Sequence, residues 1–233
     1  MSNSFFRFKR FCIRHDRCAM KVGTDGVLLG AWGAVGGKRI LDIGTGTGLI
    51  ALMAAQRNPE ARVLGIDVDE GAVLQAQDNM ADSPFADRVS CRLQDVLTFN
   101  ADVPFDAVLC NPPFFTEDTL PEDAARSLAR NSKNLPFSKL VTKASALLAE
   151  GGRFSIIIPA RLMTEVIGLC LSEGMYLERR CLVRTLPHKP PRRVMLTFSR
   201  NPNASCEEQQ LCIMATDGPR SQDYAELTKD FFL

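Results

Sequence analysis

Apolar residues in the first two thirds of the chain follow two alternating patterns. Short, nearly continuous apolar runs are typical of strands buried on both faces, and segments with apolar residues three or four positions apart are typical of helices. The strand-like runs are Arg39–Ile43, Arg62–Asp67, Val89–Leu93, Ala107–Cys110 and Arg153–Ile158. The helical segments between and after them are Gly48–Arg57, Glu70–Met80, Lys139–Ala149 and Arg161–Ser172. This alternation predicts a parallel sheet covered by helices on both faces.

The last third of the chain has a different pattern. Two strand-like runs, Met175–Arg184 and Arg193–Ser199, have no helix between them, which predicts an antiparallel pair. Tyr224–Leu233 is expected to form a short terminal helix, and Asn201–Gln210 and Thr116–Asn134 are expected to be mobile loops. The predicted fold is α/β, a doubly wound, mainly parallel seven-stranded sheet with an antiparallel C-terminal strand pair. A chain of 233 residues fits a single domain over residues 1–233.

Composition narrows the class of protein. Hydrophobic residues make up 45% of the chain, yet no run reaches the roughly 18–20 apolar residues that would span a bilayer. The N-terminus lacks the apolar core of a secretory signal. The eight cysteines include no C-x-x-C pair, and the chain has two histidines, so neither disulfides nor a metal site is expected. We expect a reduced, cytoplasmic protein without membrane contact, and a monomer.

The net charge of +1 conceals two basic segments. Residues 5–21 carry six basic side chains against Asp16, and residues 178–200 carry seven against Glu178. Such asymmetry is compatible with a polyanionic partner, although ordinary solvated charge gives a similar pattern. The candidate RNA contacts in these segments are Arg7, Lys9, Arg10, Arg14, Lys189, Arg192 and Arg193.

A glycine-rich turn, Leu41-Asp-Ile-Gly-Thr-Gly-Thr-Gly-Leu49, joins the first predicted strand of the alternation to its first helix. Glycine allows the backbone to approach a ligand closely, and the start of a helix supplies free N–H groups. The turn does not fit the dinucleotide pattern, which would need glycine at position 49. An acid directly before the glycines suits a cationic group, such as an ammonium, better than a pyrophosphate. The candidate ligand contacts here are Asp42, Gly44, Thr45, Gly46 and Gly48.

Two further acids follow neighbouring strands. Asp67 ends the second strand, where an acid reaches ribose hydroxyls in doubly wound sheets, and Val68 follows it. Asp95, with Val96 beside it, follows the third strand and is placed to receive an adenine amino group. Each acid alone is weak support, since surface loops contain many aspartates. Together with the glycine turn they indicate a ligand with an ammonium, a ribose and an adenine but no phosphate, which is S-adenosylmethionine.

The fourth strand ends in Asn111-Pro-Pro-Phe114. Proline prevents the strand from continuing and holds Asn111 at the carboxyl edge of the sheet. The Asn111 side-chain oxygen and the Pro112 carbonyl can accept both hydrogens of a conjugated amine, which directs its lone pair toward an incoming methyl group. Pro113 stiffens the turn, and Phe114 can stack on a flat substrate. A turn that merely happens to contain asparagine is the alternative.

These motifs resemble those of known enzymes. Asp42-x-Gly-x-Gly-x-Gly48 with Asn111-Pro-Pro-Phe114 resembles the class I amino-methyltransferases that modify adenine, guanine or glutamine nitrogens. The blocks Phe8–Trp32, Ser83–Phe85, Ala129–Arg130 and Tyr224–Leu233 are similar to the bacterial valine tRNA (adenine-37-N6)-methyltransferases, and this likeness runs nearly end to end. The chain departs from the pattern at Phe114, where tyrosine is common, and in the extent of Thr116–Asn134.

The resemblance implies methyl transfer from S-adenosylmethionine to N6 of an adenine in tRNA, expected to be adenine 37 of a valine tRNA. It also implies that residues 1–36 form an N-terminal cap over the cofactor site. In that cap Arg17, Lys21, Gly23 and Thr24 would hold the methionine end of the cofactor, and Arg130 would contact RNA. Thr24 or Asp25 could instead cap a helix over Gly26–Trp32, whose apolar stripe is expected to lie in the core.

Three alternatives stay open from the sequence. A protein glutamine N5-methyltransferase uses the same Asn-Pro-Pro chemistry, but it usually carries an extra N-terminal helical domain. The segment before the first strand of the alternation is short, basic and aromatic here, which favours RNA. A guanine N2-methyltransferase acting on RNA would share most of these features. A binding protein without catalysis is disfavoured because Asn111 and the cofactor acids are all present.

Overall fold

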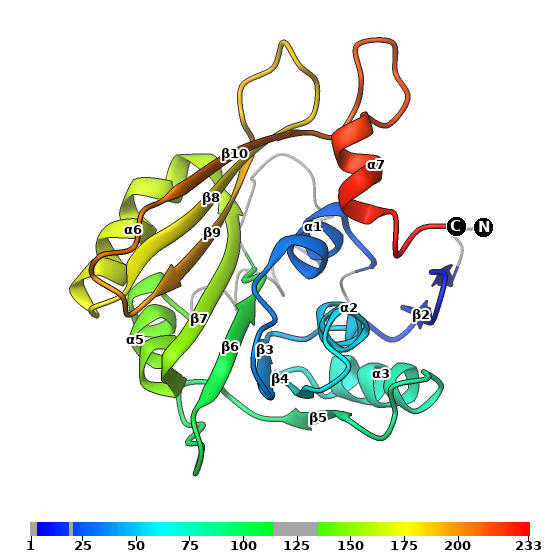
Figure 1. Cartoon of the computed structure of the whole chain (residues 1–233). Coiled ribbons are helices and arrows are strands. Elements are labelled where there is room, and N and C mark those ends of the chain that lie inside the picture. The colour runs from blue at the N-terminus through cyan, green and yellow to red at the C-terminus, as the bar shows by residue number, and fades with distance from the viewer. Residues whose placement is uncertain (1–3, 19–20, 114–134) are drawn as a thin grey trace.

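The computed structural model describes residues 4–18, 21–113 and 135–233. Its centre is an eight-stranded sheet with the strand order β10-β8-β9-β7-β6-β3-β4-β5 (Figure 1). The strands are β3 (Arg39–Ile43), β4 (Arg62–Asp67), β5 (Val89–Leu93), β6 (Phe105–Cys110), β7 (Leu148–Pro159), β8 (Tyr176–Arg184), β9 (Arg193–Ser199) and β10 (Glu207–Cys212). Strands β3 to β7 are mutually parallel, and β9 runs antiparallel to both β7 and β8. The parallel sheet and the antiparallel pair are therefore confirmed.

Helices cover both faces of the sheet, as expected for buried parallel strands. The helices are α1 (Thr24–Trp32), α2 (Leu49–Arg57), α3 (Glu70–Ala81), α5 (Phe137–Leu147), α6 (Met163–Ser172) and α7 (Gln222–Thr228), with a short 3₁₀ turn at Ala160–Leu162. One half of the core packs α1 and α2 against residues such as Ile40 and Val63. The other half packs α5 and α6 against residues such as Leu41 and Val108. The apolar stripe of α1 is buried, as predicted.

The sheet has one strand more than the predicted seven. Strand β10 lies partly in the segment Asn201–Gln210 that was expected to be a mobile loop, and it pairs in parallel with β8. Its residues Glu-Glu-Gln-Gln show no apolar periodicity because β10 is an edge strand. It is held by its backbone pairing with β8 and by the buried Leu211, and two ion pairs add to this, since Arg179 pairs with Glu207 at 3.5 Å and Arg180 pairs with Glu208. Basic residues that looked unpaired in the sequence are thus matched by acids about thirty positions away.

The two ends of the chain also differ from expectation. Residues Phe5–Arg7 (β1) and Cys12–Arg14 (β2) form a small antiparallel sheet that the sequence did not indicate. Helix α7 ends at Thr228, not Leu233, and the residues after it turn back so that Phe231 is buried and its carbonyl accepts from the Lys9 N–H at 2.8 Å. The N- and C-terminal segments therefore lie side by side (Figure 1).

The start of α1 corrects a second expectation. Gly23 is the N-cap residue, without a side-chain hydrogen bond, so neither Thr24 nor Asp25 caps the helix. Asp25 instead accepts from Arg193 Nε at 2.9 Å and ties α1 to β9.

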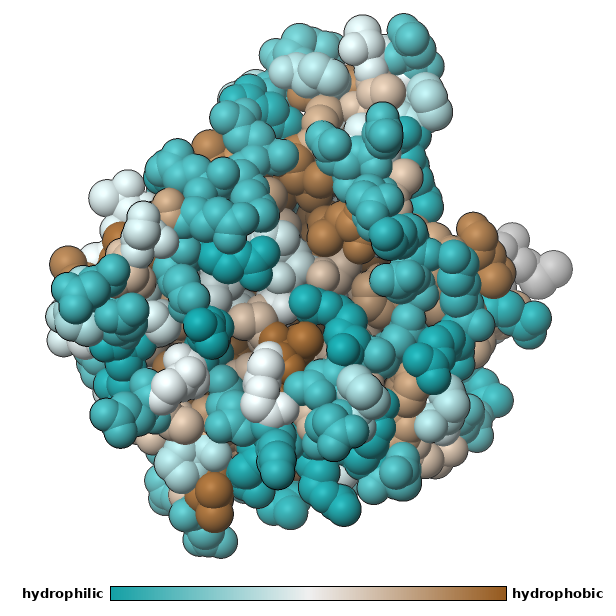
Figure 2. All heavy atoms as spheres, viewed as in Figure 1, coloured by the Kyte–Doolittle hydropathy of each residue, from teal (hydrophilic) through white to brown (hydrophobic). Residues whose placement is uncertain are grey.

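The visible surface is mainly polar. Figure 2 shows a largely hydrophilic face on which several apolar residues are grouped near the middle of the view. Across the described ranges, no helix is long and apolar enough to cross a membrane, and no group of side chains has the makeup of a metal site.

Candidate active site

A cavity of about 380 Å³ lies at the carboxyl ends of β3, β4, β5 and β6. It is the edge at which open α/β sheets bind ligands. Its walls are Cys18, Ile43, Gly44, Gly46, Ile66, Asp67, Val68, Asp69, Ala72, Gln94, Asp95, Val96, Cys110, Asn111, Pro112, Pro113 and Leu135. The structure thus brings together the glycine turn, both acids that follow strands, and the Asn-Pro-Pro segment.

The glycine turn adopts a backbone that favours glycine. Gly44, Gly46 and Gly48 have φ angles of 71°, 55° and 82°. A Cβ at Gly44 or Gly46 would meet no heavy atom within 4 Å, so the space above the turn is open. Gly48 is packed against α3 and does not line the cavity. The turn is anchored to β4, because the N–H groups of Gly44 and Thr45 both donate to the Ile66 carbonyl.

Asp42 is fully buried beneath this turn. One carboxylate oxygen accepts from the Thr45 hydroxyl at 2.7 Å, and the other has no hydrogen-bond partner among the described residues. Burial raises the pKa of Asp42 to about 7, the charge of Asp67 adds to the rise, and the Thr45 hydrogen bond opposes it. Asp42 and Thr45 do not line the cavity themselves. The unpartnered oxygen is nevertheless a buried acceptor that a cationic group could satisfy.

Asp67 connects β4 to the glycine turn. Its two carboxylate oxygens accept from the N–H groups of Gly46 at 2.9 Å and Asp69 at 3.0 Å. Burial raises the pKa of Asp67, and these hydrogen bonds oppose the rise. Asp69 in turn caps α3 by accepting from the Ala72 N–H at 2.8 Å. Carboxylate oxygens still have free lone pairs after one hydrogen bond each, so Asp67 can accept further donors from a ligand.

The third strand contributes its end to the same cavity. Asp95 is exposed and accepts from the Leu97 N–H at 2.8 Å, whereas Val96 beside it is buried. Gln94 also lines the cavity, and its N–H donates to the Asp67 carbonyl at 2.8 Å. The sequence analysis did not select Gln94 or Asp69. Both flank a selected aspartate, so their position after a strand was the available signal.

Asn111 lines the cavity at the carboxyl end of β6. It directly follows the strand, it is half-buried, and no described residue hydrogen-bonds its side chain. Pro112 is buried and Pro113 half-buried, so the turn is fixed while the amide remains available. Phe114 and Arg130, with the rest of Thr116–Asn134, lie outside the described residues.

The predicted N-terminal cap reaches the cavity at one described residue, Cys18. Arg17 is directed elsewhere, because its side chain pairs with Asp78 at 2.9 Å and its N–H donates to Gln75. Lys21, Gly23 and Thr24 do not line the cavity. Cys18 lies in an irregular segment between the β1–β2 sheet and α1. No motif around it in the sequence indicated that it would line the cavity.

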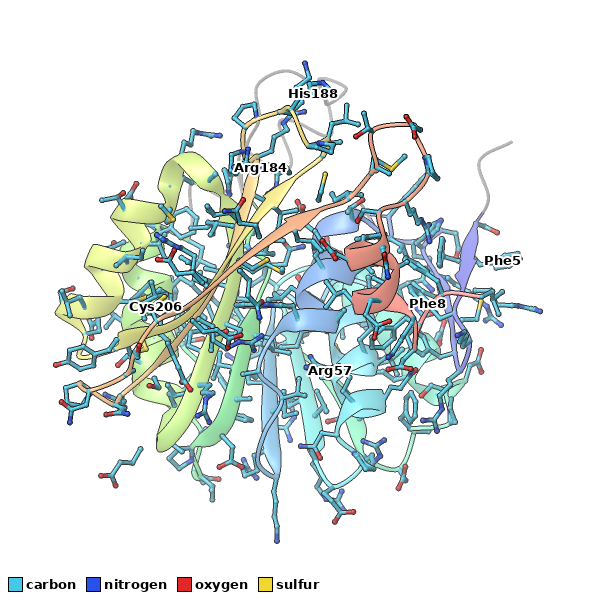
Figure 3. All side chains as sticks on the ribbon, turned by 45° about the horizontal axis from the view of Figure 1, so that its top comes forward. Phe5, Phe8, Arg57, Arg184, His188 and Cys206 are labelled. Atoms are coloured by element: carbon cyan, nitrogen blue, oxygen red, sulfur yellow. The ribbon has the colours of Figure 1, made fainter. Side chains whose placement is uncertain are left out.

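The candidate RNA contacts lie on two parts of the molecule. Strand β8 runs parallel to β7, so the β8–β9 loop, residues 185–192, emerges at the same sheet edge as Asn111. Figure 3 shows Arg184 and His188 projecting at this edge. Arg192 and Lys189 are exposed there.

Several of the basic residues have partners within the protein. Arg193 is tied to Asp25. Arg14 pairs with Asp82 at 3.1 Å, Arg10 lies over the Phe85 ring, and Lys9 donates to the Lys229 carbonyl. Arg7 is exposed on β1, on the side of the molecule where the chain ends meet.

Comparison with known proteins identifies relatives over the whole chain. The family model of the methyltransferase small domain matches residues 23–175. A tRNA1(Val) (adenine(37)-N6)-methyltransferase from Bacteroides thetaiotaomicron is 43% identical, with 100% of this chain and 99% of that protein covered. Its counterpart from Phocaeicola vulgatus is 44% identical at the same coverage.

Solved structures support the fold. A predicted O-methyltransferase from Agrobacterium tumefaciens superposes with a TM-score of 0.66 at 22% identity, covering 89% of this chain and 96% of that one. A glycopeptide N-methyltransferase complexed with S-adenosylmethionine superposes with a TM-score of 0.55 at 11% identity, covering 78% and 100%. At these identities the likeness concerns the fold alone.

Proposed function

The chain belongs to the methyltransferase small-domain family and, within it, to the tRNA1(Val) (adenine(37)-N6)-methyltransferases, and from this premise we propose that it methylates N6 of adenine 37 in a valine tRNA. The observation that carries the proposal is the meeting of Asn111-Pro-Pro with Asp67 and Asp95 around one cavity. The relatives favour adenine over the glutamine and guanine alternatives, because they match the chain from end to end. S-adenosylmethionine is the proposed methyl donor.

The residues present fit this cofactor. The unpartnered Asp42 oxygen suits a cation, and the open space over Gly44 and Gly46 allows close approach of a ligand. Asp67 retains acceptor capacity for ribose hydroxyls, and Asp95 with Val96 offers an acid and an apolar surface for an adenine. When bound, S-adenosylmethionine supplies an electrophilic methyl group on a sulfonium. The proposed contacts of Arg17, Lys21, Gly23, Thr24, Thr45 and Gly48 receive less support, because none of these residues lines the cavity. Asp42 does not line it either, and its support is the unpartnered buried oxygen.

Asn111 and Pro112 would act on the target base. The exocyclic nitrogen of adenine is a poor nucleophile because its lone pair is delocalised into the ring. When its two N–H groups donate to the Asn111 side-chain oxygen and the Pro112 carbonyl, the nitrogen is drawn toward tetrahedral geometry and its lone pair is freed. The positive charge that develops on nitrogen is stabilised by the same two acceptors. The nitrogen then loses one proton to water. Stacking by Phe114 remains part of the proposal.

The RNA would be held by basic side chains at the sheet edge. Arg192 and Lys189 on the β8–β9 loop are exposed at the same sheet edge as the cavity, and Arg7 is exposed on β1. A base must leave its stack to enter a cavity of this kind, and phosphate contacts hold the flanking nucleotides while it does so. A single domain over 1–233, a cap formed by 1–36, a cytoplasmic location and a monomeric state remain predictions.

Asn111→Ala tests the catalytic assignment. We expect turnover on a valine tRNA transcript to fall by about 10²-fold or more, since one preorganised polar contact is lost, with little change in cofactor affinity. Asn203→Ala, an exposed asparagine away from the cavity, is the matched control and should retain full activity. A transcript with guanine at position 37 should not be methylated by the wild-type protein. Equal labelling of that transcript, or labelling of a release factor instead of tRNA, would contradict the proposed substrate.

A further inference from the structure

A second cavity, of about 260 Å³, lies at the opposite edge of the sheet from the candidate active site. We call it the arginine pocket, after the residues that line it: Arg39, Arg62, Arg88 and Arg92, with Asp87 and Phe105. Four arginines and one aspartate are among the residues that line this cavity. Like charges held together in a folded protein repel one another, so such a group calls for an explanation.

The fold places these arginines together through strand register. Arg39 begins β3 and lies beside Arg62, which begins β4, while Arg88 directly precedes β5. Adjacent strands are roughly 4.8 Å apart, so the first two side chains are direct neighbours. Residues 94–104, which connect β5 to β6, contain no helix. Among the described residues, no helix therefore covers this end of β4 and β5 on the Arg62 side.

Two of the arginines are fixed in place. The Arg39 guanidinium lies 5.2 Å from the centre of the Phe105 ring and donates to the Val103 carbonyl at 3.2 Å. Arg88 donates to the carbonyls of Ala55 at 2.6 Å and Asn58 at 3.0 Å, near the end of α2. These interactions use N–H donors of the two guanidinium groups, but the acceptors are neutral carbonyls and do not neutralise the positive charges. Arg39 and Arg88 therefore line the pocket with fixed side chains, and the Arg88 guanidinium is directed toward the end of α2.

The other two arginines are available for a ligand. Arg62 and Arg92 are exposed, and neither has an acid or hydrogen-bond partner among the described residues. Several other arginines pair with acids, as Arg153 does with Glu178 at 2.9 Å and Arg14 with Asp82 at 3.1 Å. Asp87 is the one acid that lines the pocket, so three positive charges remain in excess.

We propose that the arginine pocket binds a phosphate group. Guanidinium groups match phosphate oxygens in bidentate geometry, and several arginines together favour a doubly charged anion over a single carboxylate. The phosphate can belong to the tRNA backbone or to a free nucleotide or pyrophosphate, since both present the same oxygens. The site goes beyond the proposed function, because binding of free pyrophosphate requires neither tRNA nor methyl transfer.

Calorimetric titration with inorganic pyrophosphate is the first test. Arg62→Ala and Arg92→Ala should each weaken its binding to the full-length protein by about tenfold, the size expected for a lost charge-assisted hydrogen bond. Lys139→Ala removes one exposed charge from α5, outside the pocket, and is the matched control that should bind like wild type. Arg62 and Arg92 are both exposed, so neither substitution should disturb folding. If one variant fails to fold, the other still tests the site.

Titration with tRNA at several salt concentrations identifies the source of the phosphate. If the pocket holds an RNA phosphate, Arg62→Ala should reduce the log–log salt slope of tRNA binding by about one unit, and Lys139→Ala should not. If only pyrophosphate binding is lost, the ligand is a free phosphate. If wild-type protein fails to bind pyrophosphate and Arg62→Ala binds tRNA like Lys139→Ala, the phosphate site is refuted. Methylation by the wild-type protein, measured in parallel, reports on the proposed function separately.

Discussion

At the scale of single residues, Asp42 is unfavourable for folding, and the proposed cofactor would relieve that cost. It is fully buried, and one of its oxygens lacks a partner among the described residues. An ionised carboxylate in that position is destabilising unless a cation joins it. The raised pKa, about 7, expresses this cost.

The pH dependence of the unfolding free energy should reveal the cost of burying the Asp42 carboxylate. Between the unfolded pKa of about 3.9 and the native value of about 7, the native state holds a proton that the unfolded state has lost. This contribution to the unfolding free energy of the ligand-free protein therefore falls as pH rises through that window, by at most about 4 kcal/mol, and is constant above it. Relative to wild type, Asp42→Asn should gain stability from pH 4 to 7. Urea unfolding at several pH values measures the difference.

A cofactor control separates the two roles of this residue. Saturating S-adenosylmethionine should flatten the wild-type pH slope, because a nearby cation favours the ionised carboxylate. A stability difference between wild type and Asp42→Asn that is the same at every pH would show that Asp42 is already ionised in the folded protein.

Asp67 differs because both of its oxygens already hold the backbone of the site. Asp67→Asn keeps one acceptor oxygen and replaces the other with a donor, so it conserves shape while removing an acceptor for the ligand. Its affinity for S-adenosylmethionine should fall by about tenfold or more, as expected when buried polar groups of a ligand lose a partner. Calorimetry measures the affinity, with the exposed Asp87→Asn as control. Unchanged affinity in Asp67→Asn would remove the ribose assignment.

At the scale of elements, the β8–β9 connection carries one arginine with an acidic partner and one that is proposed to bind RNA. Arg193 begins β9 and is tied to Asp25 on α1, and less than a quarter of its side chain is exposed, at 23%. Its neighbour Arg192 is exposed, and no acid among the described residues pairs with its side chain. The sequence alone does not distinguish Arg192 from Arg193, whereas the structure gives only Arg193 an acidic partner among the described residues.

The two alanine substitutions should therefore separate. Arg192→Ala should weaken tRNA binding and reduce the salt slope by about one unit without altering thermal stability. Arg193→Ala should lower the unfolding free energy by about 1–2 kcal/mol, since it leaves Asp25 half-buried without this partner. Asp25→Asn should reproduce that loss. Salt-dependent tRNA titrations and thermal melts distinguish the variants, and identical behaviour of both arginine variants would contradict the assignment.

At the scale of the whole molecule, the sequence predicts elements whose periodicity is imposed by burial. Strands β3, β4 and β9 were predicted with the observed bounds, because strands buried in the sheet must be apolar. The bounds of β5 were also predicted, although it is an edge strand in which only Val89 and Cys91 are buried. Strand β10 could not be predicted in this way, since its first four residues are polar and its partner strand β8 lies about thirty positions away in the sequence. The positions of Asp67, Asp95 and Asn111 follow from parallel topology, which gathers strand ends at one edge. Cys18 reaches that edge only through the path of the N-terminal segment, which no local pattern encodes.

That path depends on contacts between the two ends of the chain. The Phe232 ring stacks on Phe8 with centroids 5.9 Å apart and meets the Phe6 ring at 5.8 Å. The guanidinium of Arg220 lies 4.2 Å from the centre of the Phe232 ring. The C-terminal segment thus holds the β1–β2 sheet, and the chain continues from that sheet to Cys18 at the cavity wall.

Phe232→Ala should consequently affect a site that the residue does not touch. Loss of this partly buried aromatic ring should cost about 2–3 kcal/mol of unfolding free energy, less than the roughly 3–5 kcal/mol typical of fully buried rings. Affinity for S-adenosylmethionine should also fall several-fold, because the N-terminal segment becomes less firmly held beside the cavity. Leu233→Ala changes the neighbouring residue, which is 84% exposed, and should alter neither quantity. Thermal melts and calorimetry on both variants decide the matter. A destabilised Phe232→Ala protein with wild-type cofactor affinity would show that the chain ends support the fold without supporting the site.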